Sequence, residues 1–188
     1  QEIYTTGNDF EVKTAAYLPN NFNCSNDDAT IDDRSGKKGP EAEAVTIGQI
    51  EDKTFAFIGL ERIGGIMVYD ITNPEKTEFV NYINSRDFST DIGGDDSPEG
   101  IHFIAGNDSI TGKPQLVVAY EVSGTVGVYD LTLQKNSDQS GDDKTDNPSQ
   151  EPTVEETNNS SNTNTNNKNH SVNTGDASNI AITIISLI

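Results

Sequence analysis

The chain has 188 residues, a hydrophobic content of 32% and a formal net charge of −19, so its hydrophobic residues can form a core over only part of its length. Residues 1–133 carry 23 acidic and nine basic side chains, and a surface of this sign repels phosphate backbones, so no nucleic-acid partner is expected. Cys24 is the single cysteine, which excludes an internal disulfide and a cysteine-based metal cluster.

The N-terminal region combines one short apolar run with a long polar stretch. The sequence starts with neither Met nor a signal peptide, so we expect that processing or truncation removed the true beginning. The segment "DFEVKTAAYL" (residues 9–18) is interpreted as the last strand of a preceding unit. "NNFNCSNDDATIDDRSGKKG" (residues 20–39) is predicted to be a long acidic loop.

An internal repeat follows this loop. "GPEAEAVTIGQIEDKTFAFIGLERIGGIMVYDIT" begins at Gly39, and "SPEGIHFIAGNDSITGKPQLVVAYEVSGTVGVYDLT" begins at Ser97. Both copies start with Pro-Glu and end on Val-Tyr-Asp-(Ile/Leu)-Thr. Tyr69 and Tyr129 are 60 positions apart and Pro40 and Pro98 are 58 apart. This spacing predicts that one turn of the second copy is two residues longer.

The composition of each copy is typical of short antiparallel strands. Val, Ile, Phe and Tyr alternate with Gly, Asp-Lys and Asn-Pro turns, and no segment has a convincing helical period. We expect strands at residues 44–50, 54–60, 65–71, 78–83, 100–105, 115–122 and 125–131. The predicted fold class is all-β, with two blades of a β-propeller followed by a disordered tail.

Two blades cannot close a propeller, which typically has about 4–8. Residues 1–133 are therefore predicted to be the C-terminal part of a longer propeller. Every Phe and Tyr lies at or before Tyr129, and residues 134–172 are almost entirely polar. Such a stretch cannot bury enough apolar surface to offset the entropy of ordering it, so residues 134–172 are predicted to be a disordered linker.

The motifs of the repeat resemble a known family. "RSGKKGPEAEAVTIG", "TFAFIGLERIGGIMVYDITNP", "FVNYINSRDF", "SPEGIHFI" and "QLVVAYEVSGTVGVYDL" occur in this order. Together they are similar, over about residues 8–131, to the end of the choice-of-anchor I domain and to mesenchyme-specific cell surface glycoproteins. The resemblance implies a propeller-like module of an exported, surface-held protein. Some members of the family stand beside a metallophosphatase or 5'-nucleotidase domain, and some carry an alkaline-phosphatase label.

Glu41 and Glu99 each follow the Pro of a Pro-Glu pair and are interpreted as equivalent positions of the two copies. Repeated carboxylates at one blade position could bind Ca²⁺, which takes six to eight oxygen ligands. The structural alternative is that each Glu binds its own turn or pairs with an arginine such as Arg34 or Arg62. The sequence leaves both readings open.

A second acidic group is found in the loop "DIGGDDSPEG", where Asp95 and Asp96 precede Glu99. Its spacing differs from that of an EF-hand. Weak Ca²⁺ binding by Asp95 and Asp96 is therefore a secondary hypothesis beside a simple solvated loop. No other cofactor is predicted, and cations or a surface ligand are the expected partners.

The catalytic inventory of the sequence is small. His102 lies in an apolar strand and His170 in the polar tail, and no Ser-His-Asp or Cys-His arrangement follows from the spacing. The leading hypothesis is an extracellular, surface-anchored module with a binding or structural role and no catalysis of its own. The alternative is part of a secreted phosphatase-like or 5'-nucleotidase-associated enzyme, whose chemistry would lie upstream.

The C-terminal segment "SVNTGDASNIAITIISLI" resembles a truncated Gram-positive cell-wall sorting signal. Thr174 and Gly175 match the pair that a sortase cleaves, whereas Ser171 and Val172 stand where Leu and Pro usually do. This reading of residues 173–188 predicts attachment to peptidoglycan at the surface of a Gram-positive bacterium. The apolar run is shorter than the roughly 20 residues of a membrane span. A GPI signal and a packed C-terminal strand are the alternatives.

Overall fold

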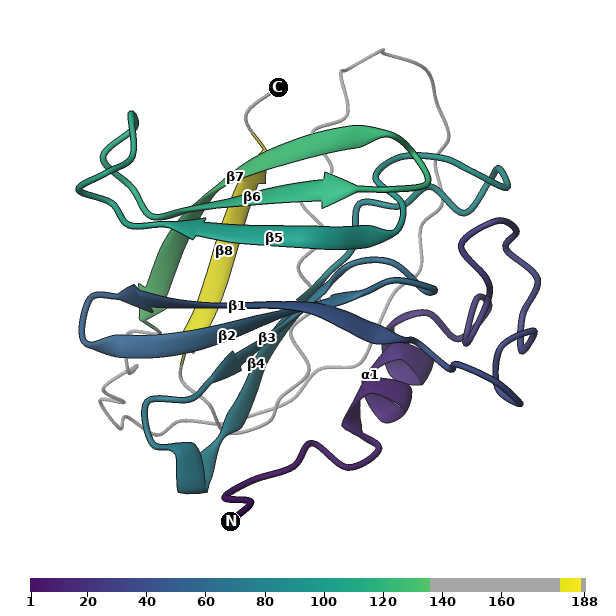
Figure 1. The fold of residues 1–188 in the computed structure, drawn as a ribbon, viewed down its shortest axis with the longest axis horizontal. Coiled ribbons are helices and arrows are strands. Elements are labelled where there is room, and N and C mark those ends of the chain that lie inside the picture. The colour runs from purple at the N-terminus through teal and green to yellow at the C-terminus, as the bar shows by residue number, and fades with distance from the viewer. Residues whose placement is uncertain (136–179, 187–188) are drawn as a thin grey trace, which may run out of the picture. The chain divides into compact units, whose positions relative to one another are not determined.

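The computed structural model describes residues 1–135 and 180–186, which form one short helix and two antiparallel sheets (Figure 1). Sheet 1 has the strand order β1-β2-β3-β4, and sheet 2 has the order β5-β6-β7-β8. The elements are α1 (Asp9–Tyr17), β1 (Ala42–Ile50), β2 (Lys53–Leu60), β3 (Ile66–Asp70), a 3₁₀ turn (Pro74–Lys76), β4 (Glu78–Ile83), β5 (Pro98–Ile104), β6 (Gln115–Tyr120), β7 (Thr125–Lys135) and β8 (Ile180–Ser186).

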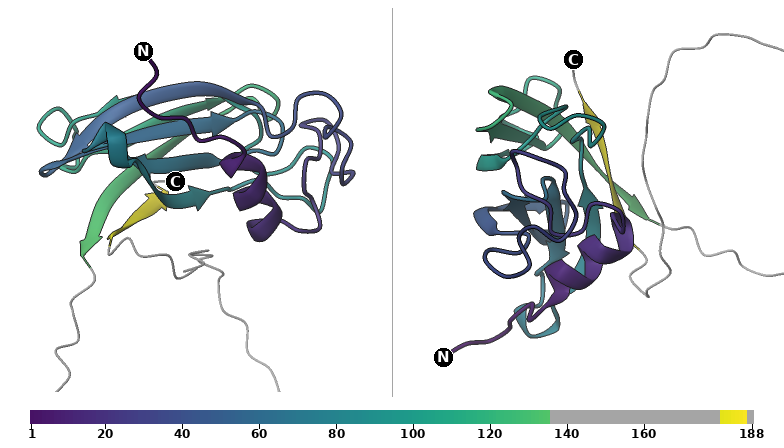
Figure 2. Two further views of the ribbon diagram at one scale, coloured as in Figure 1. Left: turned by 90° about the horizontal axis from the view of Figure 1, so that it is seen from below. Right: turned by 90° about the vertical axis from the view of Figure 1, so that its right-hand side faces the viewer.

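The strands predicted from the repeat are all present, and each copy of the repeat forms its own sheet. β4 has the predicted bounds. β7 continues to Lys135, past residue 133, where the sequence placed the end of the folded region. β8 pairs antiparallel with the second half of β7, from Tyr129↔Ser186 to Lys135↔Ile180, and Figure 2 shows it beside that extension. The rest of the predicted linker, with Thr174 and Gly175, lies outside the described residues.

The prediction of a strand over residues 9–18 is wrong, because this segment forms α1. Phe10, Thr14 and Tyr17 recur at helical spacing, and Phe10 and Tyr17 pack onto sheet 1, where Tyr17 makes edge-to-face contacts with Phe79 and Tyr82. Asp9 and Glu11 in the first turn favour the helix electrostatically. The sequence did not reveal this helix because nine residues are too few to show a clear helical period of apolar residues. The acidic loop 20–39 forms turns without helix or strand, as predicted.

The register of the two sheets corrects the alignment of the repeat. Ala42 and Pro98, 56 positions apart, face Leu60 and Tyr120, which are 60 positions apart. The hairpin between the first two strands is therefore four residues longer in sheet 2, and not two as predicted. Matching letters in the two Pro-Glu pairs hid this shift, because the equivalence of positions is set by strand pairing and by a bulge in each first strand.

The true counterpart of Glu41 is Ser97. Both residues have a positive φ, 55° for Glu41 and 66° for Ser97. The carbonyl group of each accepts a hydrogen bond of 2.8 Å from the backbone N–H of its partner strand's end, Glu61 in sheet 1 and Glu121 in sheet 2. The predicted equivalence of Glu41 and Glu99 is therefore wrong, and the counterpart of Glu99 is Glu43.

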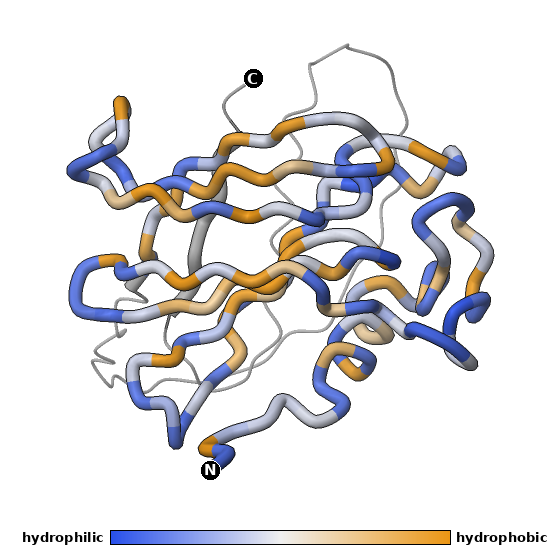
Figure 3. Tube along the Cα trace, viewed as in Figure 1, coloured by the Kyte–Doolittle hydropathy of each residue, from blue (hydrophilic) through white to orange (hydrophobic). Residues whose placement is uncertain are grey.

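Two apolar cores hold the described residues together. One lies between the sheets, and the other lies between sheet 1 and the N-terminal segment with α1. Figure 3 shows the hydrophobic residues along the strands of both sheets, whereas the connecting loops are mostly hydrophilic. The residues of the first core are Ile50, Phe55, Phe57, Ile66 and Val68 from sheet 1, with Leu116, Val118, Tyr120, Tyr129 and Leu131 from sheet 2.

The sheets approach closely where β5 lies beside β1 (Figure 1). The ring of Phe103 on β5 stacks on Phe57 of β2, with centroids 6.0 Å apart and planes inclined by 17°. It also lies against Gly48 of β1, where a side-chain carbon would overlap the ring. Gly48 is thus required by packing rather than by its backbone conformation.

We predict that Gly48→Ala lowers the free energy of unfolding by about 1–3 kcal/mol, because the new methyl group must displace Phe103 from a packed core. Chemical denaturation followed by circular dichroism measures this change. Gly36→Ala is the matched control, since a side-chain carbon at Gly36 meets no atom within 4 Å. Equal stabilities of the two variants would contradict the packing argument.

Candidate functional site

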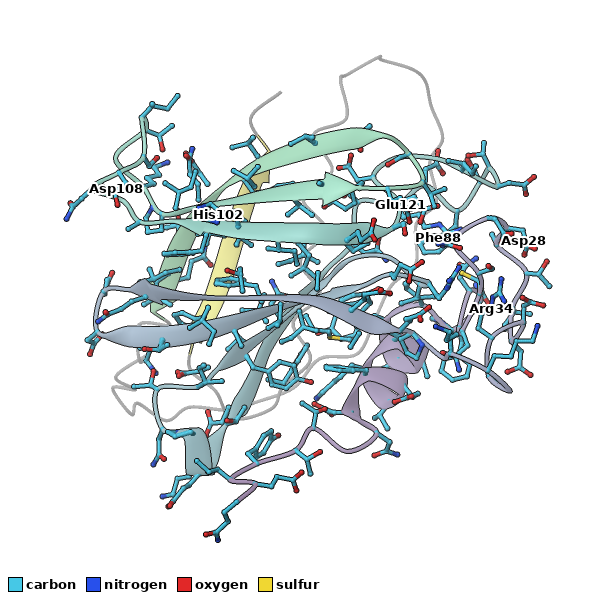
Figure 4. The ribbon with its side chains drawn as sticks, in the orientation of Figure 1. Asp28, Arg34, Phe88, His102, Asp108 and Glu121 are labelled. Carbon is cyan, nitrogen blue, oxygen red and sulfur yellow. The ribbon has the colours of Figure 1, made fainter. Side chains whose placement is uncertain are left out.

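A group of buried polar side chains lies at one end of the two sheets. In Figure 4 the labelled residues Asp28, Arg34 and Phe88 mark this end, whereas His102 and Asp108 lie toward the other end. Four separate parts of the chain contribute: the loop 20–39, the segment that follows β2, the segment that follows β4, and the segment that precedes β5. We call the following six residues the polar cluster: Ser25, Asn26, Glu61, Arg86, Asp96 and Ser97.

Arg86 follows β4 and has a fully buried side chain. Its Nη1 donates to the carbonyl oxygens of Ser25 at 2.8 Å and Arg62 at 2.9 Å, and it lies 3.6 Å from the sulfur of Cys24. The guanidinium also stacks over the ring of Phe88, 4.9 Å from its centroid. One side chain thereby joins the loop 20–39 to the turn between β2 and β3.

Asp96 supplies the negative charge opposite Arg86. Its Oδ2 lies 3.3 Å from Arg86 Nε, and neither side chain is exposed. Neither carboxylate oxygen of Asp96 has a hydrogen-bond partner among the described residues. Burial raises the pKa of Asp96 to about 6, although the charge of Arg86 opposes the shift. This ion pair connects sheet 1 to the start of sheet 2.

Asn26 is the second link between the two sheets. Its Nδ2 donates to Glu61 Oε1 at 3.0 Å and to Ser97 Oγ at 3.3 Å, and its Oδ1 accepts from Arg62 Nη1 at 2.6 Å. All of its side-chain polar atoms are therefore used inside the protein. The loop 20–39 reaches both sheets through this one amide.

Three carboxylates lie close together at the polar cluster, and one of them, Glu61, belongs to it. Oxygen atoms of Glu41, Glu43 and Glu61 all lie within 4.8 Å of one another, which is close enough to hold a metal ion. Arg62 already binds two of them, with Nε 2.6 Å from Glu41 Oε2 and Nη2 3.2 Å from Glu61 Oε1. Lys38 forms a further ion pair with Glu41. A cation would therefore have to compete with two internal positive charges.

The protonation of this group depends on burial. Burial raises the pKa of Glu61 to about 7, and a hydrogen bond with Glu43 adds to the effect. Burial alone would also raise the pKa of Glu41, but hydrogen bonds from Lys38 and Arg62 outweigh it and hold that pKa below its usual value. Near neutral pH, Glu61 is thus partly protonated, whereas Glu41 stays ionised.

The four carboxylates predicted from the sequence stand in different settings. Glu41 is ion-paired with Arg62, one of the two arginines named in the structural alternative, and Glu99 is exposed on β5. Asp95 accepts hydrogen bonds from Ser85, Thr125 and Tyr129, whereas Asp96 pairs with Arg86. Among the described residues, Glu41 is grouped with Glu43 and Glu61 and not with Glu99.

A Lys–Asp pair occupies the same place in both sheets. Lys53 Nζ lies 2.6 Å from Asp70 Oδ2, and Lys113 Nζ lies 3.6 Å from Asp130 Oδ2. Asp70 also accepts from the backbone N–H of Thr72 at 2.9 Å and so caps the turn that follows β3. Asp130 lies inside β7 and accepts hydrogen bonds from Gln115 and Thr111 instead.

Few side chains among residues 1–135 are suited to catalysis. His102 is exposed on β5, and Cys24 is a buried thiol whose pKa is raised by burial, which disfavours the nucleophilic thiolate. The charged groups of the polar cluster bind partners inside the protein, because Arg86 pairs with Asp96 and Glu61 pairs with Arg62. Such an arrangement stabilises the fold more directly than it presents reactive atoms to a substrate. No helix of the described segments is long and apolar enough to cross a membrane.

Comparison with known proteins relates the N-terminal part of the chain to one family. Residues 1–74 match the family model described as the Choice-of-anchor I domain, which confirms the resemblance seen in the sequence motifs for this part of the chain. The matched segment covers α1, the loop 20–39 and the first three strands.

One relative among curated proteins is Gigasin-3a of Magallana gigas, which is 29% identical over 150 residues. The alignment covers 70% of this chain and 51% of Gigasin-3a, so the chain spans about half the length of this curated relative. No solved structure matches the chain.

We predict that Arg86→Met destabilises the chain by about 3–5 kcal/mol, because it leaves the buried Asp96 carboxylate without its counter-ion. The double variant Arg86→Met, Asp96→Asn should lose less than the sum of the two single changes, since it removes both charges. Urea denaturation of the four proteins completes this double-mutant cycle. Strict additivity would mean that the ion pair carries no coupling.

We also predict that the stability of the chain falls as the pH rises through about 7. The pKa of Glu61 in the folded state lies above its ordinary value of 4.5, so its contribution is fully present below pH 4.5 and is lost as the pH rises through about 7. Glu61→Gln should flatten this fall, on the order of 1–3 kcal/mol. Urea denaturation across this pH range measures it. The control is Glu78→Gln, at an exposed position of β4, and an unchanged profile in Glu61→Gln would refute the assignment.

Proposed function

We propose that the chain is part of an extracellular, surface-anchored β-propeller with a binding or structural role and no catalysis of its own. The observation that carries this proposal is the repetition of three paired strands, with the same register, in two consecutive copies that pack through a shared apolar core. The match to the Choice-of-anchor I domain supports the surface location.

The arrangement of the strands supports the propeller reading. The strand order within each sheet follows the chain, as in a propeller blade, and the first strands β1 and β5 lie beside each other. In a propeller the first strands of successive blades line a central channel in this way. The fourth strand differs, because β4 follows β3 directly whereas β8 comes from the far end of the chain.

The mode of anchoring is a separate hypothesis. Sortase cleavage between Thr174 and Gly175, with attachment to peptidoglycan, rests on the resemblance to a sorting signal. The pairing of Ile180–Ser186 with β7 favours the packed-strand alternative for that part of the segment. After wall digestion, mass spectrometry of the protein from its native host separates the two. A peptide that ends at Thr174 and is joined to peptidoglycan supports sorting, and a soluble peptide that runs through Ile188 rules it out.

Calcium binding is a further hypothesis, now centred on Glu41, Glu43 and Glu61 rather than on Glu41 with Glu99. Arg62 and Lys38 oppose it, because they already neutralise Glu41. Ca²⁺ that raises the melting temperature of the wild-type chain but not of Glu43→Gln would support a site here. Equal melting temperatures with and without Ca²⁺ would remove it.

We predict that the chain releases no phosphate from a chromogenic phosphate ester, with or without added divalent metal ions. The reason is that its buried carboxylates and arginines pair with one another, and His102 has no hydrogen bond to an acid or a nucleophile among the described side chains. Phosphate release that depends on added metal and is abolished by a chelator would instead support the phosphatase-like alternative. Surface labelling of intact host cells tests the location independently.

A further inference from the structure

The contact between the two sheets uses one face of each. Sheet 1 contributes the face that carries Phe57, Ile66 and Val68, which are 0–2% exposed, and we call it the front face. Sheet 2 contributes the face that carries Ile101 and Phe103, which pack against the shared core, and we call it the back face. The front face of one sheet thus packs on the back face of the next.

The register of the repeat identifies the back face of sheet 1. Because the first strands are offset by 56 positions, Val45 and Ile47 are the counterparts of Ile101 and Phe103. Val45 is 65% exposed and Ile47 is 61% exposed. Two branched apolar residues are therefore in solvent at the positions that sheet 2 uses for its contact with sheet 1.

The same reasoning identifies the front face of sheet 2. An offset of 60 makes Val126 the counterpart of Ile66 and Ala119 the counterpart of Gly59. Val126 is 66% exposed, and Ala119, which pairs with it across the strands, is exposed as well. Ile66, in contrast, is 2% exposed inside the interface. Around Val126 and Ala119 the second sheet thus lacks the neighbour that the first sheet has on this face, whereas Gln115 and Asp130 at the other end of the face are buried.

The N-terminal segment leaves the relevant part of the back face open. α1 packs against Tyr69, Phe79 and Tyr82, which lie on β3 and β4. Val45 and Ile47 lie on β1, at the opposite edge of sheet 1. Between the sheets, the back-face strand β5 contacts β1 and β2. The uncovered part of the back face of sheet 1 is therefore its first strand, β1, and the corresponding first strand of sheet 2, β5, makes the existing contact between the sheets.

We propose that a second copy of this chain docks head to tail, with the front face of sheet 2 in one copy on the back face of sheet 1 in the other. The contact continues the interface already present between the sheets, and it is heterologous, because each copy contributes a different face. It deepens the proposed propeller and rests on it, since it treats the sheets as equivalent blades. The net charge of −19 opposes association at low ionic strength, so salt should strengthen the contact.

Two variants that preserve net charge test the two faces separately. The back-face variant is Val45→Glu, Ile47→Lys, and the front-face variant is Ala119→Glu, Val126→Lys; all four positions are exposed, so neither variant disturbs the core. The control is Ile31→Glu, Ile110→Lys, which changes exposed apolar residues in loops outside both faces. Circular dichroism and thermal melting verify that each protein is folded.

Sedimentation velocity at moderate salt, over a wide range of concentration, gives the readout. The wild type and the control should associate as concentration rises, whereas each face variant alone should stay monomeric. An equimolar mixture of the two variants keeps one intact face of each kind and should form a species with the mass of two chains and nothing larger.

A wild type that stays monomeric at every concentration would overturn the proposal, as would a mixture that forms no dimer or a face variant that associates like the wild type. In the last case the contact would lie elsewhere, for instance at the β8 edge. None of these results bears on the surface location or on the absence of phosphatase activity, which are measured separately.

Discussion

The buried ion pair of Arg86 and Asp96 is the constraint on which the arrangement of the described chain depends. A desolvated guanidinium is tolerated only when acceptors and a counter-charge surround it. Here the carbonyls of Ser25 and Arg62 accept its hydrogen bonds and the carboxylate of Asp96 supplies the counter-charge, and these three groups come from segments that are distant in sequence. The loop 20–39 has no helix or strand to satisfy its backbone, so these bonds fix its position. The same contacts hold the start of sheet 2 against the end of sheet 1. Hydrophobic burial alone has no direction and would not select this single arrangement.

The apolar interface between the sheets adds a second, steric condition. Phe103 can lie flat on Phe57 only because Gly48 has no side chain. Gly59 has a similar role, since a side-chain carbon there would lie 2.9 Å from the carbonyl oxygen of Pro98. Small residues on β1 and β2 thus set how closely the first strand of sheet 2 approaches. Electrostatic pairing at one end and close packing between the strands therefore determine the same geometry independently.

The sequence predicted the seven strands of the repeat because period-two alternation and turn residues are local signals. It failed where the outcome depends on tertiary contacts. α1 was missed because Phe10, Thr14 and Tyr17 make a helical stripe only in relation to the sheet they face. The equivalence of Glu41 with Ser97 was missed because the hairpin between the first two strands is four residues longer in sheet 2, which shifts the true counterparts away from the matching Pro-Glu letters. Arg86 stands in an unremarkable loop, and nothing in its local sequence signals that it becomes buried.

The distribution of polar groups explains where interactions with other molecules are to be sought. Inside the polar cluster, Asn26 and Arg62 already bind internal partners, so a ligand would have to break existing bonds before it gained new ones. The exposed branched residues on β1 and β7 have no such internal competition, and covering them releases apolar surface from water at no cost in broken polar bonds. A strongly acidic chain is otherwise repelled from copies of itself. Apolar contact between the repeated sheet faces is therefore the short-range interaction that favours association of two copies. The acidic surface opposes association elsewhere and so limits it to those faces.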